Sequence, residues 1–215
     1  MIVPAREIGV AVCSAATLLT LVGFGSGASA YDGSQAVTML GEPLTLVQST
    51  TVLSPPALQF HRDGLLHVAW IEKNGGQGEV KTTAIPADHS TVARVSVSPP
   101  GVGPEAVHQS PGLAISGDGE QFVTWSSPNK TPGALFASHL QLARSVDRGA
   151  HFQPPVQVND DGLAISHTFE HVVTGKDNAV YVAWLDGRNK DRSGAGIMFA
   201  RSPDHGATVG KNLVL

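Results

Sequence analysis

The sequence predicts an all-β fold built from about three copies of one four-stranded unit, and three observations support this. A ten-residue segment at 143–152 recurs at 200–209, which places Asp147 and Asp204 57 positions apart. The three tryptophans are separated by 55 and 59 positions, close to the same interval. Each tryptophan ends a run of alternating apolar residues. A fixed period of this length is typical of stacked copies of one supersecondary unit.

The first half of each unit reads as a hairpin. Alternating apolar runs at 66–70, 122–125 and 180–184 predict strands that end in tryptophan. About six positions before each tryptophan stands a turn pair, namely Asp63-Gly64, Asp118-Gly119 and Asp177-Asn178. Such pairs supply the positive φ that tight hairpins need. We expect the three tryptophans to pack between neighbouring sheets rather than to bind ligand.

The second half of each unit has a variable loop and then two more strands around an Asp-containing turn. In the first unit the expected strands are 57–60, 65–70, 80–85 and 92–97. Asp88, 59 positions before Asp147, marks what looks like a worn copy of the turn. Four antiparallel strands per repeat make a β-propeller blade. The expected blades are 54–109, 110–163 and 164–215.

The recurring turn resembles the Asp-box, or bacterial neuraminidase repeat, with the pattern S-x-D-x-G-x-x-W/F. The matching residues are Ser145, Asp147, Gly149 and Phe152 in one copy and Ser202, Asp204 and Gly206 in the other, where Val209 takes the aromatic place. The resemblance covers roughly residues 54–215 and implies a sialidase-like β-propeller. In such a turn the aspartate accepts backbone N–H bonds and the glycine allows a left-handed residue. The motif is therefore a folding element and not a catalytic one.

Three blades form only part of a ring, since closed propellers typically have four to eight. We expect an arc of a six-bladed whole, completed by further residues or, less favoured, by a second copy of the chain. Residues 31–53 form an N-terminal segment in this scheme. Within it, 45–53 reads as one more strand that closes the ring.

The N-terminal 30 residues have the pattern of a secretory signal. Arg6 precedes an apolar stretch from Ile8 to about Phe24, and Ala28-Ser29-Ala30 offers the small-residue cleavage site. An uncleaved membrane anchor is the alternative, but the glycines in the stretch weaken it. We expect a secreted or periplasmic protein, cleaved after Ala30 and with no membrane contact thereafter. Cys13, the sole cysteine, is removed with the signal.

Composition argues against some partners and cofactors. The chain has a formal net charge of −4, 15% charged residues and no basic stripe, which argues against a nucleic-acid partner. His167 to His171 spells H-x-x-E-H, a zinc pattern that needs a helix. In a strand the two histidines stand about 13 Å apart and cannot share a metal. Neither a metal nor a cofactor is expected.

Strand parity narrows the search for a functional site. In an antiparallel blade the hairpin turns and the Asp-box turns share one end, so the loops between second and third strands and the blade crossovers share the other. The resemblance implies an active site at this second end. Its chemically richest loop, 184–192, contains Asp186 as a candidate acid/base and Arg188 as a candidate binder of a substrate carboxylate. The alternative is an Asp186–Arg188 pair that only closes its own loop.

The crossover 166–171 supplies two further candidates at the same end. His167 and Glu170 are candidate substrate-binding residues. The alternative for both is ordinary packing or a surface position. Glycan or glycoconjugate is the expected partner.

The resemblance implies an exo-sialidase, in which arginines hold the substrate carboxylate, an aspartate is the acid/base and a tyrosine is the nucleophile. This sequence departs from that pattern. The first-blade segment 54–58 has no arginine, and neither Tyr31 nor Tyr181 is placed as a nucleophile. Two hypotheses therefore stay open, a secreted sialidase-like glycoside hydrolase and a non-catalytic propeller that binds glycan or protein.

Overall fold

The computed structural model describes residues 8–13, 18–23, 44–47, 51–73, 75–88, 90, 93–106, 109–188 and 194–215. The chain divides into two compact units, 1–50 and 51–215. In the first unit β1 (Ile8–Cys13), β2 (Leu18–Gly23) and β3 (Leu44–Val47) form an antiparallel sheet. Among the described residues, no helix has the length and apolar character needed to span a membrane. The expected cleavage site at Ala30 lies outside the described residues, and the secretory signal stays a prediction.

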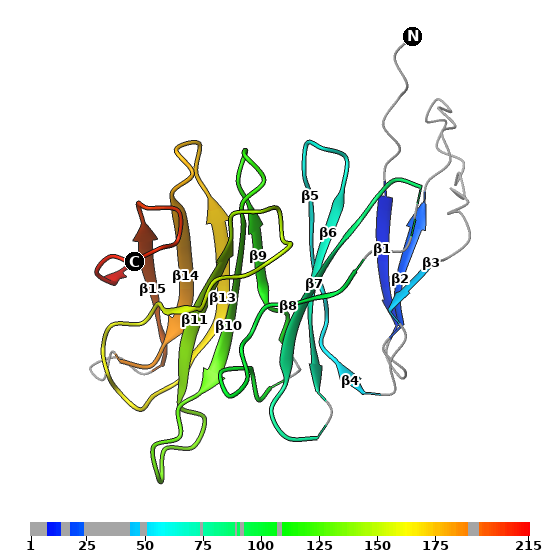
Figure 1. Cartoon of the computed structure of the whole chain (residues 1–215). Coiled ribbons are helices and arrows are strands. Elements are labelled where there is room, and N and C mark those ends of the chain that lie inside the picture. The colour runs from blue at the N-terminus through cyan, green and yellow to red at the C-terminus, as the bar shows by residue number, and fades with distance from the viewer. Residues whose placement is uncertain are drawn as a thin grey trace, which may run out of the picture. The chain divides into compact units, whose positions relative to one another are not determined.

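The second unit contains three antiparallel sheets, which confirms the predicted all-β fold with three blades of four strands (Figure 1). The first sheet has one additional short strand. The first sheet consists of β4 (Val52–Leu53), β5 (Ala57–Phe60), β6 (Leu66–Lys73), β7 (Glu79–Ile85) and β8 (Val95–Ser96). The second consists of β9 (Gly112–Ile115), β10 (Gln121–Pro128), β11 (Ser138–Ser145) and β12 (Val156–Gln157). The third consists of β13 (His167–Thr174), β14 (Val180–Asp186), β15 (Gly196–Ser202) and β16 (Leu213–Val214).

Two details of the strands differ from the sequence prediction. The expected strand at 45–53 is divided, because β3 ends at Val47 while β4 pairs with the far end of β6 and continues the edge that β5 occupies. The tryptophan-bearing strands also run beyond the tryptophan, to Lys73, Pro128 and Asp186. Cross-strand pairing extends those strands, and single-sequence alternation does not reveal it.

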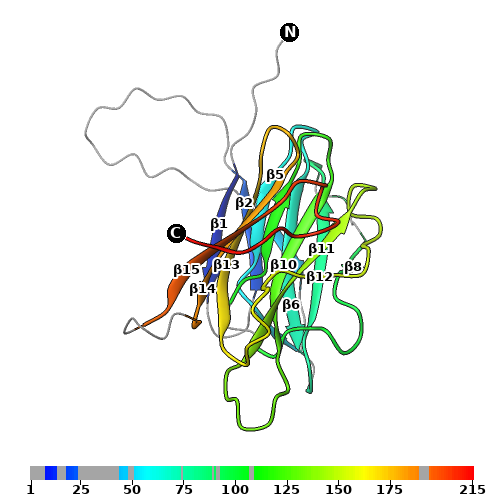
Figure 2. The same cartoon turned by 90° about the vertical axis from the view of Figure 1, so that its left-hand side faces the viewer.

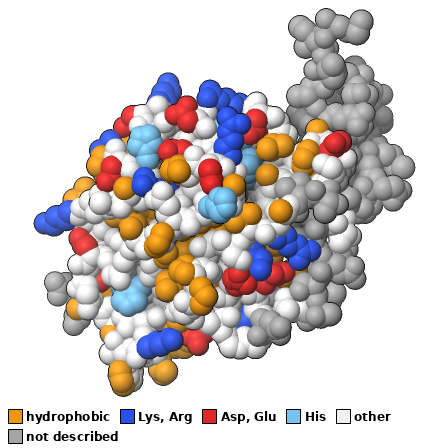
Figure 3. Space-filling view, in the orientation of Figure 1, with side chains coloured by type: hydrophobic (Ala, Val, Ile, Leu, Met, Phe, Trp, Pro, Cys, Tyr) orange, Lys and Arg blue, Asp and Glu red, His pale blue; other side chains and the backbone are white. Residues whose placement is uncertain are grey.

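The sheets lie face against face, with β9 contacting both β5 and β13 (Figures 1 and 2). On the side shown in Figure 3, lysine and arginine side chains are interspersed with aspartate and glutamate. This mixed surface matches a chain with 14 basic and 18 acidic residues.

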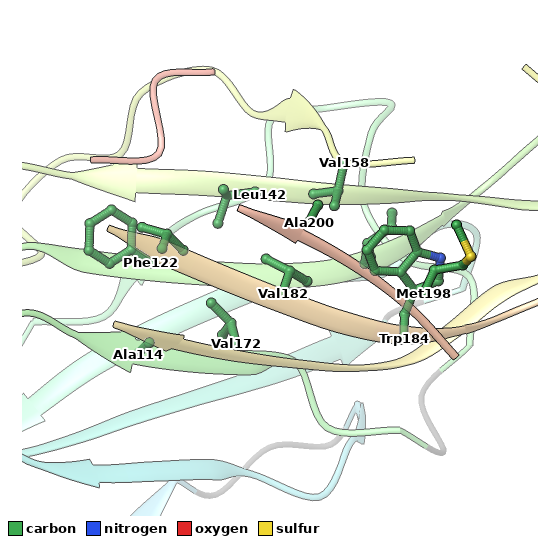
Figure 4. Packing of buried hydrophobic residues seen from close by; sticks show 11 residues of the cluster. Ala114, Phe122, Leu142, Val158, Val172, Val182, Trp184, Met198 and Ala200 are labelled. Carbon is green, nitrogen blue, oxygen red and sulfur yellow. The ribbon is translucent and has the colours of Figure 1, made fainter. Parts of the chain in front are cut away.

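Apolar side chains fill both interfaces between sheets. Between the first and second sheets the buried cluster consists of Ile71, Val80, Val97, Val123, Trp125 and Ala143. Between the second and third it consists of Ala114, Phe122, Leu140, Leu142, Val158, Val172, Val180, Val182, Trp184, Met198 and Ala200 (Figure 4). The three tryptophans are at most 2% exposed, which confirms that they are packing residues. The two interfaces together therefore use both faces of the second sheet.

The turns after β11 and β15 share one hydrogen-bond pattern. In the later turn the Asp204 carboxylate accepts from the Ser202 hydroxyl at 2.7 Å and from the Thr208 amide at 2.9 Å. The Gly206 amide donates to the Ser202 hydroxyl at 2.8 Å, and Gly206 has a φ of 77°. Only glycine takes this conformation readily. A Cβ at Gly206 would also lie 3.1 Å from the Phe122 ring, so the glycine permits the close approach of the second sheet.

The first sheet does not carry the same turn in register, so Asp88 is not equivalent to Asp147. Ile85 takes the ladder position that Ser145 takes in the second sheet, because they pair with Leu66 and Gln121 respectively. Asp88 therefore lies three residues after Ile85, whereas Asp147 lies two residues after Ser145. The copy of the turn that the spacing predicted at Asp88 is therefore shifted by one residue relative to the strand ladder.

The Asp204 turn predicts acid sensitivity. Bonds from the Thr208 hydroxyl and amide, and from the Ser202 hydroxyl, lower the pKa of Asp204 to about 2 from 3.8. A carboxyl whose folded pKa is depressed contributes stability above its unfolded pKa, and that stability is lost as pH falls from about 4 to about 2. We expect Asp204→Asn to cost about 1 kcal/mol at pH 6, after allowance for solvent screening, and less at pH 2.

Denaturant unfolding at both pH values measures this effect. Glu105→Gln, at an exposed position, is the control and should leave both values unchanged. An equal loss for Asp204→Asn at the two pH values would contradict the ionic role of the carboxylate.

Candidate functional site

The two ends of the second unit have different roles. At one end the turns of neighbouring sheets join, for example where His205 Nδ1 lies 2.7 Å from a Glu120 carboxylate oxygen. At the opposite end lie the loop between β10 and β11 and the crossover that enters β13 (Figure 1). This is the end at which strand parity placed the candidate residues.

A β-bulge at the start of β13 redirects Glu170. The register with β14 shifts between Thr168 and His171, and Phe169 within the bulge has a φ of 57°. Bulges occur often beside active sites, where they re-aim a side chain. Positive φ is costly for a bulky residue and is found where the surroundings enforce it. Here the bulge leaves Phe169 63% exposed and brings the Glu170 carboxylate to Ser126 of the second sheet.

The repeat shows that the glutamate is a departure from the structural pattern. The same register shift occurs in the first sheet, where Leu53 pairs with Glu72 as His167 pairs with Asp186. Pro56 stands at the position of Glu170, 114 residues earlier. In the second sheet the equivalent residue is also a proline, Pro111. The fold therefore accepts proline here, and a carboxylic acid is not needed to build the bulge.

The environment of Glu170 favours its protonated form. Burial raises the pKa of Glu170 to about 7, against the opposing effects of its own backbone amide and of the Ser126 hydroxyl. The Ser126 hydroxyl lies 2.6 Å from the His167 carbonyl oxygen and 3.3 Å from the Glu170 carboxylate. A hydroxyl has one hydrogen, and here the shorter contact takes it. The bond from Ser126 to the Glu170 carboxylate is therefore the weaker one, and burial sets the direction of the pKa shift.

His167 lies in a fully buried polar cluster. Its Nδ1 is 2.5 Å from the Ser138 carbonyl oxygen, and its Nε2 is 3.1 Å from Asp161 and 3.6 Å from Asp186. Each ring nitrogen of His167 therefore faces an oxygen atom of a neighbouring segment. The Ser138 hydroxyl also bonds to the His167 backbone at 2.8 Å. His167 thereby ties the crossover to β11.

Asp186 and Arg188 form a bidentate pair at the same end. Arg188 donates from Nε and Nη2 to the two Asp186 oxygens at 3.0 and 2.9 Å, and its backbone amide adds a third bond at 2.8 Å. Trp184 Nε1 donates to Asp186 at 2.8 Å. Asp186 is 1% exposed and is the last residue of β14, whereas the sequence had placed it in a loop. This geometry supports the alternative in which the pair closes its own loop.

Arg188 also reaches the crossover and the last loop of the third sheet. Its Nη1 lies 2.8 Å from Asp160, and its Nη2 lies 2.9 Å from the Asn212 amide oxygen. The Asp160 carboxylate in turn accepts from the backbone N–H of Asn212 at 3.0 Å. Three segments that are distant in sequence therefore meet at one guanidinium.

A cation could in principle be held by Asp161, His167 and Asp186, whose ligand atoms all lie within 4.8 Å of one another. The Ser138 carbonyl orients the imidazole in the way that metal-bound histidines are often oriented. The Arg188 guanidinium, however, lies 2.9 Å from Asp186 and 3.5 Å from Asp161 and already supplies positive charge there. The expectation that no metal binds stays a prediction.

The zinc pattern is not built as a helix. His167 to His171 lies in β13, as the repeat register predicted. His167 is buried against the second sheet, whereas His171 is exposed. The two side chains therefore do not converge on one ion.

A cavity of about 630 Å³ lies away from these residues. Its lining comes from the first and second sheets and the turn after β11, namely 77–79, 96–101 and 152–154. None of the candidate catalytic or substrate-binding residues contributes to it, whereas Phe152 of the first Asp-box turn does.

No family model matches the chain, and no curated protein matches it either. Solved structures do resemble it. A polysaccharide lyase, Uly1, aligns with a TM-score of 0.55 and 14% sequence identity, over 98% of this chain and 60% of the lyase. An endo-arabinase from Bacteroides thetaiotaomicron VPI-5482 aligns with a TM-score of 0.50 and 16% identity, over 89% of this chain and 70% of the arabinase.

The chain has a β-propeller fold. At these identities the likeness shows the fold alone, and the present chain spans about 60% of the length of the lyase. The three-sheet arrangement and the structural matches together confirm the architecture expected from the sequence. The narrower resemblance to sialidases stays a prediction.

The structure brings His167, Asp186 and Arg188 into one network and places Glu170 three residues further along β13. Sequence reasoning missed Ser126, Ser138, Asp161 and Asn212, which complete these contacts. Asp161 lies within a crossover already placed at this end, so strand parity could have found it. Asn212 carries no recognisable signal, because its role depends on how the last loop returns to the second sheet.

Proposed function

We propose that this propeller is a secreted, glycan-active protein of the glycoside hydrolase type, with Glu170 as its proton donor. The observation that carries the proposal is a carboxylic acid with a pKa of about 7 on a bulge where the other two sheets have proline. Hydrolysis of a glycosidic bond needs an acid that keeps its proton near neutral pH. Phe169, exposed in the same bulge, offers an apolar surface for the face of a sugar ring.

In this proposal Glu170 protonates the glycosidic oxygen as the bond to the leaving sugar breaks. Such reactions use a second carboxylate as nucleophile or as base toward water. Asp186, the catalytic candidate from the sequence, and Asp161 lie around His167 at the start of the same strand. His167 acts here as a positioning residue, because its Nε2 lies 3.1 Å from Asp161 and 3.6 Å from Asp186.

The exo-sialidase activity implied by the resemblance is a narrower form of the proposal. It requires Arg188 to bind a sialic acid carboxylate. Within the described residues Arg188 is bonded to Asp160, Asp186 and Asn212, so a substrate carboxylate has to displace Asp160, whose side chain is 40% exposed. A neutral glycan needs no such exchange.

A panel of fluorogenic glycosides tests the proposal on the exported protein. We expect turnover of at least one substrate, with a rate that falls as pH rises above about 7 because Glu170 then loses its proton. A sialoside in the panel tests the narrower form. An intact mass that matches a chain starting at Tyr31 would support export and cleavage after Ala30. Absence of turnover across the panel, with folded protein, would overturn the hydrolytic proposal.

The second candidate function is a non-catalytic propeller that binds glycan or protein. The saturated Asp186–Arg188 pair favours it, because both groups are already used in the fold. Binding on a glycan array without any turnover would support this function. A Phe169→Ala variant that loses binding while it keeps its stability would place the glycan at the bulge.

A further inference from the structure

One face of the third sheet is uncovered. Along β6 and β10 side chains on both faces are buried at and before the tryptophan, whereas β14 alternates between buried and exposed residues. The uncovered side chains are mostly apolar and lie on all four strands: Val173, Tyr181, Leu185, Ile197, Phe199 and Leu213. Figure 2 looks toward β13, β14 and β15 from this side. We call this the open face.

The repeat shows what covers the same face elsewhere. Leu140 and Val158 of the second sheet are 0% and 2% exposed, because the third sheet packs on them. Their equivalents, 57 positions later, are Ile197 and Leu215, which are 50% and 73% exposed. The open face therefore repeats an interface that is complete one sheet earlier.

A polar contact repeats in the same way. Arg144 donates from Nη1 to the carbonyl oxygens of Asp204 and His205, at 3.3 and 3.2 Å, and so holds the turn of the following sheet. Its equivalent, Arg201, lies 2.9 Å from Asp177 and 5.8 Å above the Tyr181 ring. Arg201 thus lies at the edge of the open face, at the position equivalent to that from which Arg144 donates to the turn of the third sheet.

We propose that the open face docks a further sheet of this same repeat. The incoming sheet covers Ile197, Phe199 and Leu215 with its tryptophan-bearing side, and the carbonyl oxygens of its Asp-containing turn accept from Arg201. The occupant is a further sheet of the repeat, because Leu140, Val158 and Arg144, at the equivalent positions of the second sheet, contact such a sheet.

A lengthened chain tests the proposal. Fusing a second copy of residues 159–215 after Leu215 keeps the 57-residue spacing and offers the open face its expected occupant. We expect hydrogen exchange to slow in β14 and β15 of the original third sheet. Unchanged exchange in those strands would overturn the proposal.

Substitutions in the two copies supply matched controls. Ile197→Lys in the original third sheet of the lengthened chain should lower the Tm by about 4 °C or more. The same substitution in the appended copy, whose face is uncovered, should shift it little. Arg201→Ala should lower the Tm of the lengthened chain but hardly that of the original. Equal shifts at both sites would contradict docking.

Measuring self-association of the original chain tests whether a second copy of the chain covers the open face instead. Light scattering after size exclusion should give a monomer at micromolar concentration. A dimer that Ile197→Lys dissociates and Val146→Lys, at an exposed position on a turn, leaves intact would make a second copy the occupant and overturn the proposal.

Discussion

Glu170→Gln is expected to lower the rate of glycan hydrolysis by about 10²–10⁴-fold while glycan binding is retained. Glutamine keeps the size and the contact with Ser126 but has no proton to give to a leaving oxygen. Turnover and binding of the same glycoside measure the two effects. Glu105→Gln, at an exposed position, is the matched control and should be indistinguishable from the parent.

The same variant should also change how stability depends on pH. Because the pKa of Glu170 is raised from 4.5 to about 7 in the folded protein, the stability that this residue contributes is present below pH 4.5 and is lost as pH rises toward 7. The shift corresponds to about 3 kcal/mol. Urea unfolding at pH 5 and pH 8 should show the parent less stable at the higher pH and Glu170→Gln nearly unchanged. A parent protein whose stability is the same at both pH values would refute the raised pKa of Glu170.

Asp186→Ala is expected to destabilise the protein by about 3–5 kcal/mol. Asp186 is 1% exposed and accepts from Arg188 and Trp184, while His167 lies 3.6 Å away. Removing it leaves the Arg188 guanidinium partly uncompensated and the Trp184 N–H without its acceptor, which costs more than loss of a surface ion pair. Equilibrium unfolding in urea measures the difference.

Asp160→Ala provides the control for this network. The Asp160 side chain is 40% exposed and contacts the same guanidinium at 2.8 Å. We expect its loss to cost about 1 kcal/mol or less. Similar losses of stability for the two variants would show that the burial of Asp186 does not determine how much it stabilises the fold. Asp186 would then again be a candidate for contact with substrate.

The repeated architecture could be predicted because its signals are local. Alternating apolar residues and Asp-Gly turns each depend on neighbouring positions, and their recurrence at an interval of about 57 residues located the three sheets. The site depends on relations between strands. The bulge at Phe169 and Glu170 appears only when β13 is paired with β14, and Asp186 joins a strand only through its partners His167 and Gly196.

The residue types predicted which groups Arg188 can bind but not which groups it contacts in the fold. A guanidinium beside an aspartate two positions away suggested either substrate binding or a local pair. The contacts to Asp160 and Asn212 come from segments 28 and 24 positions distant, and no pattern within the loop indicates them. The sequence could therefore name the residues of the cluster but not how they are shared.

The grip of Arg144 on the turn of the next sheet has a consequence for biosynthesis. The hydrophobic face of the second sheet and Arg144 are both translated before the turn of the third sheet that they contact. Newly made sheets can thus be captured in the order in which they leave the ribosome, each on a template already in place. Vectorial growth of this kind limits the time during which an apolar sheet face is available to the wrong nascent chain.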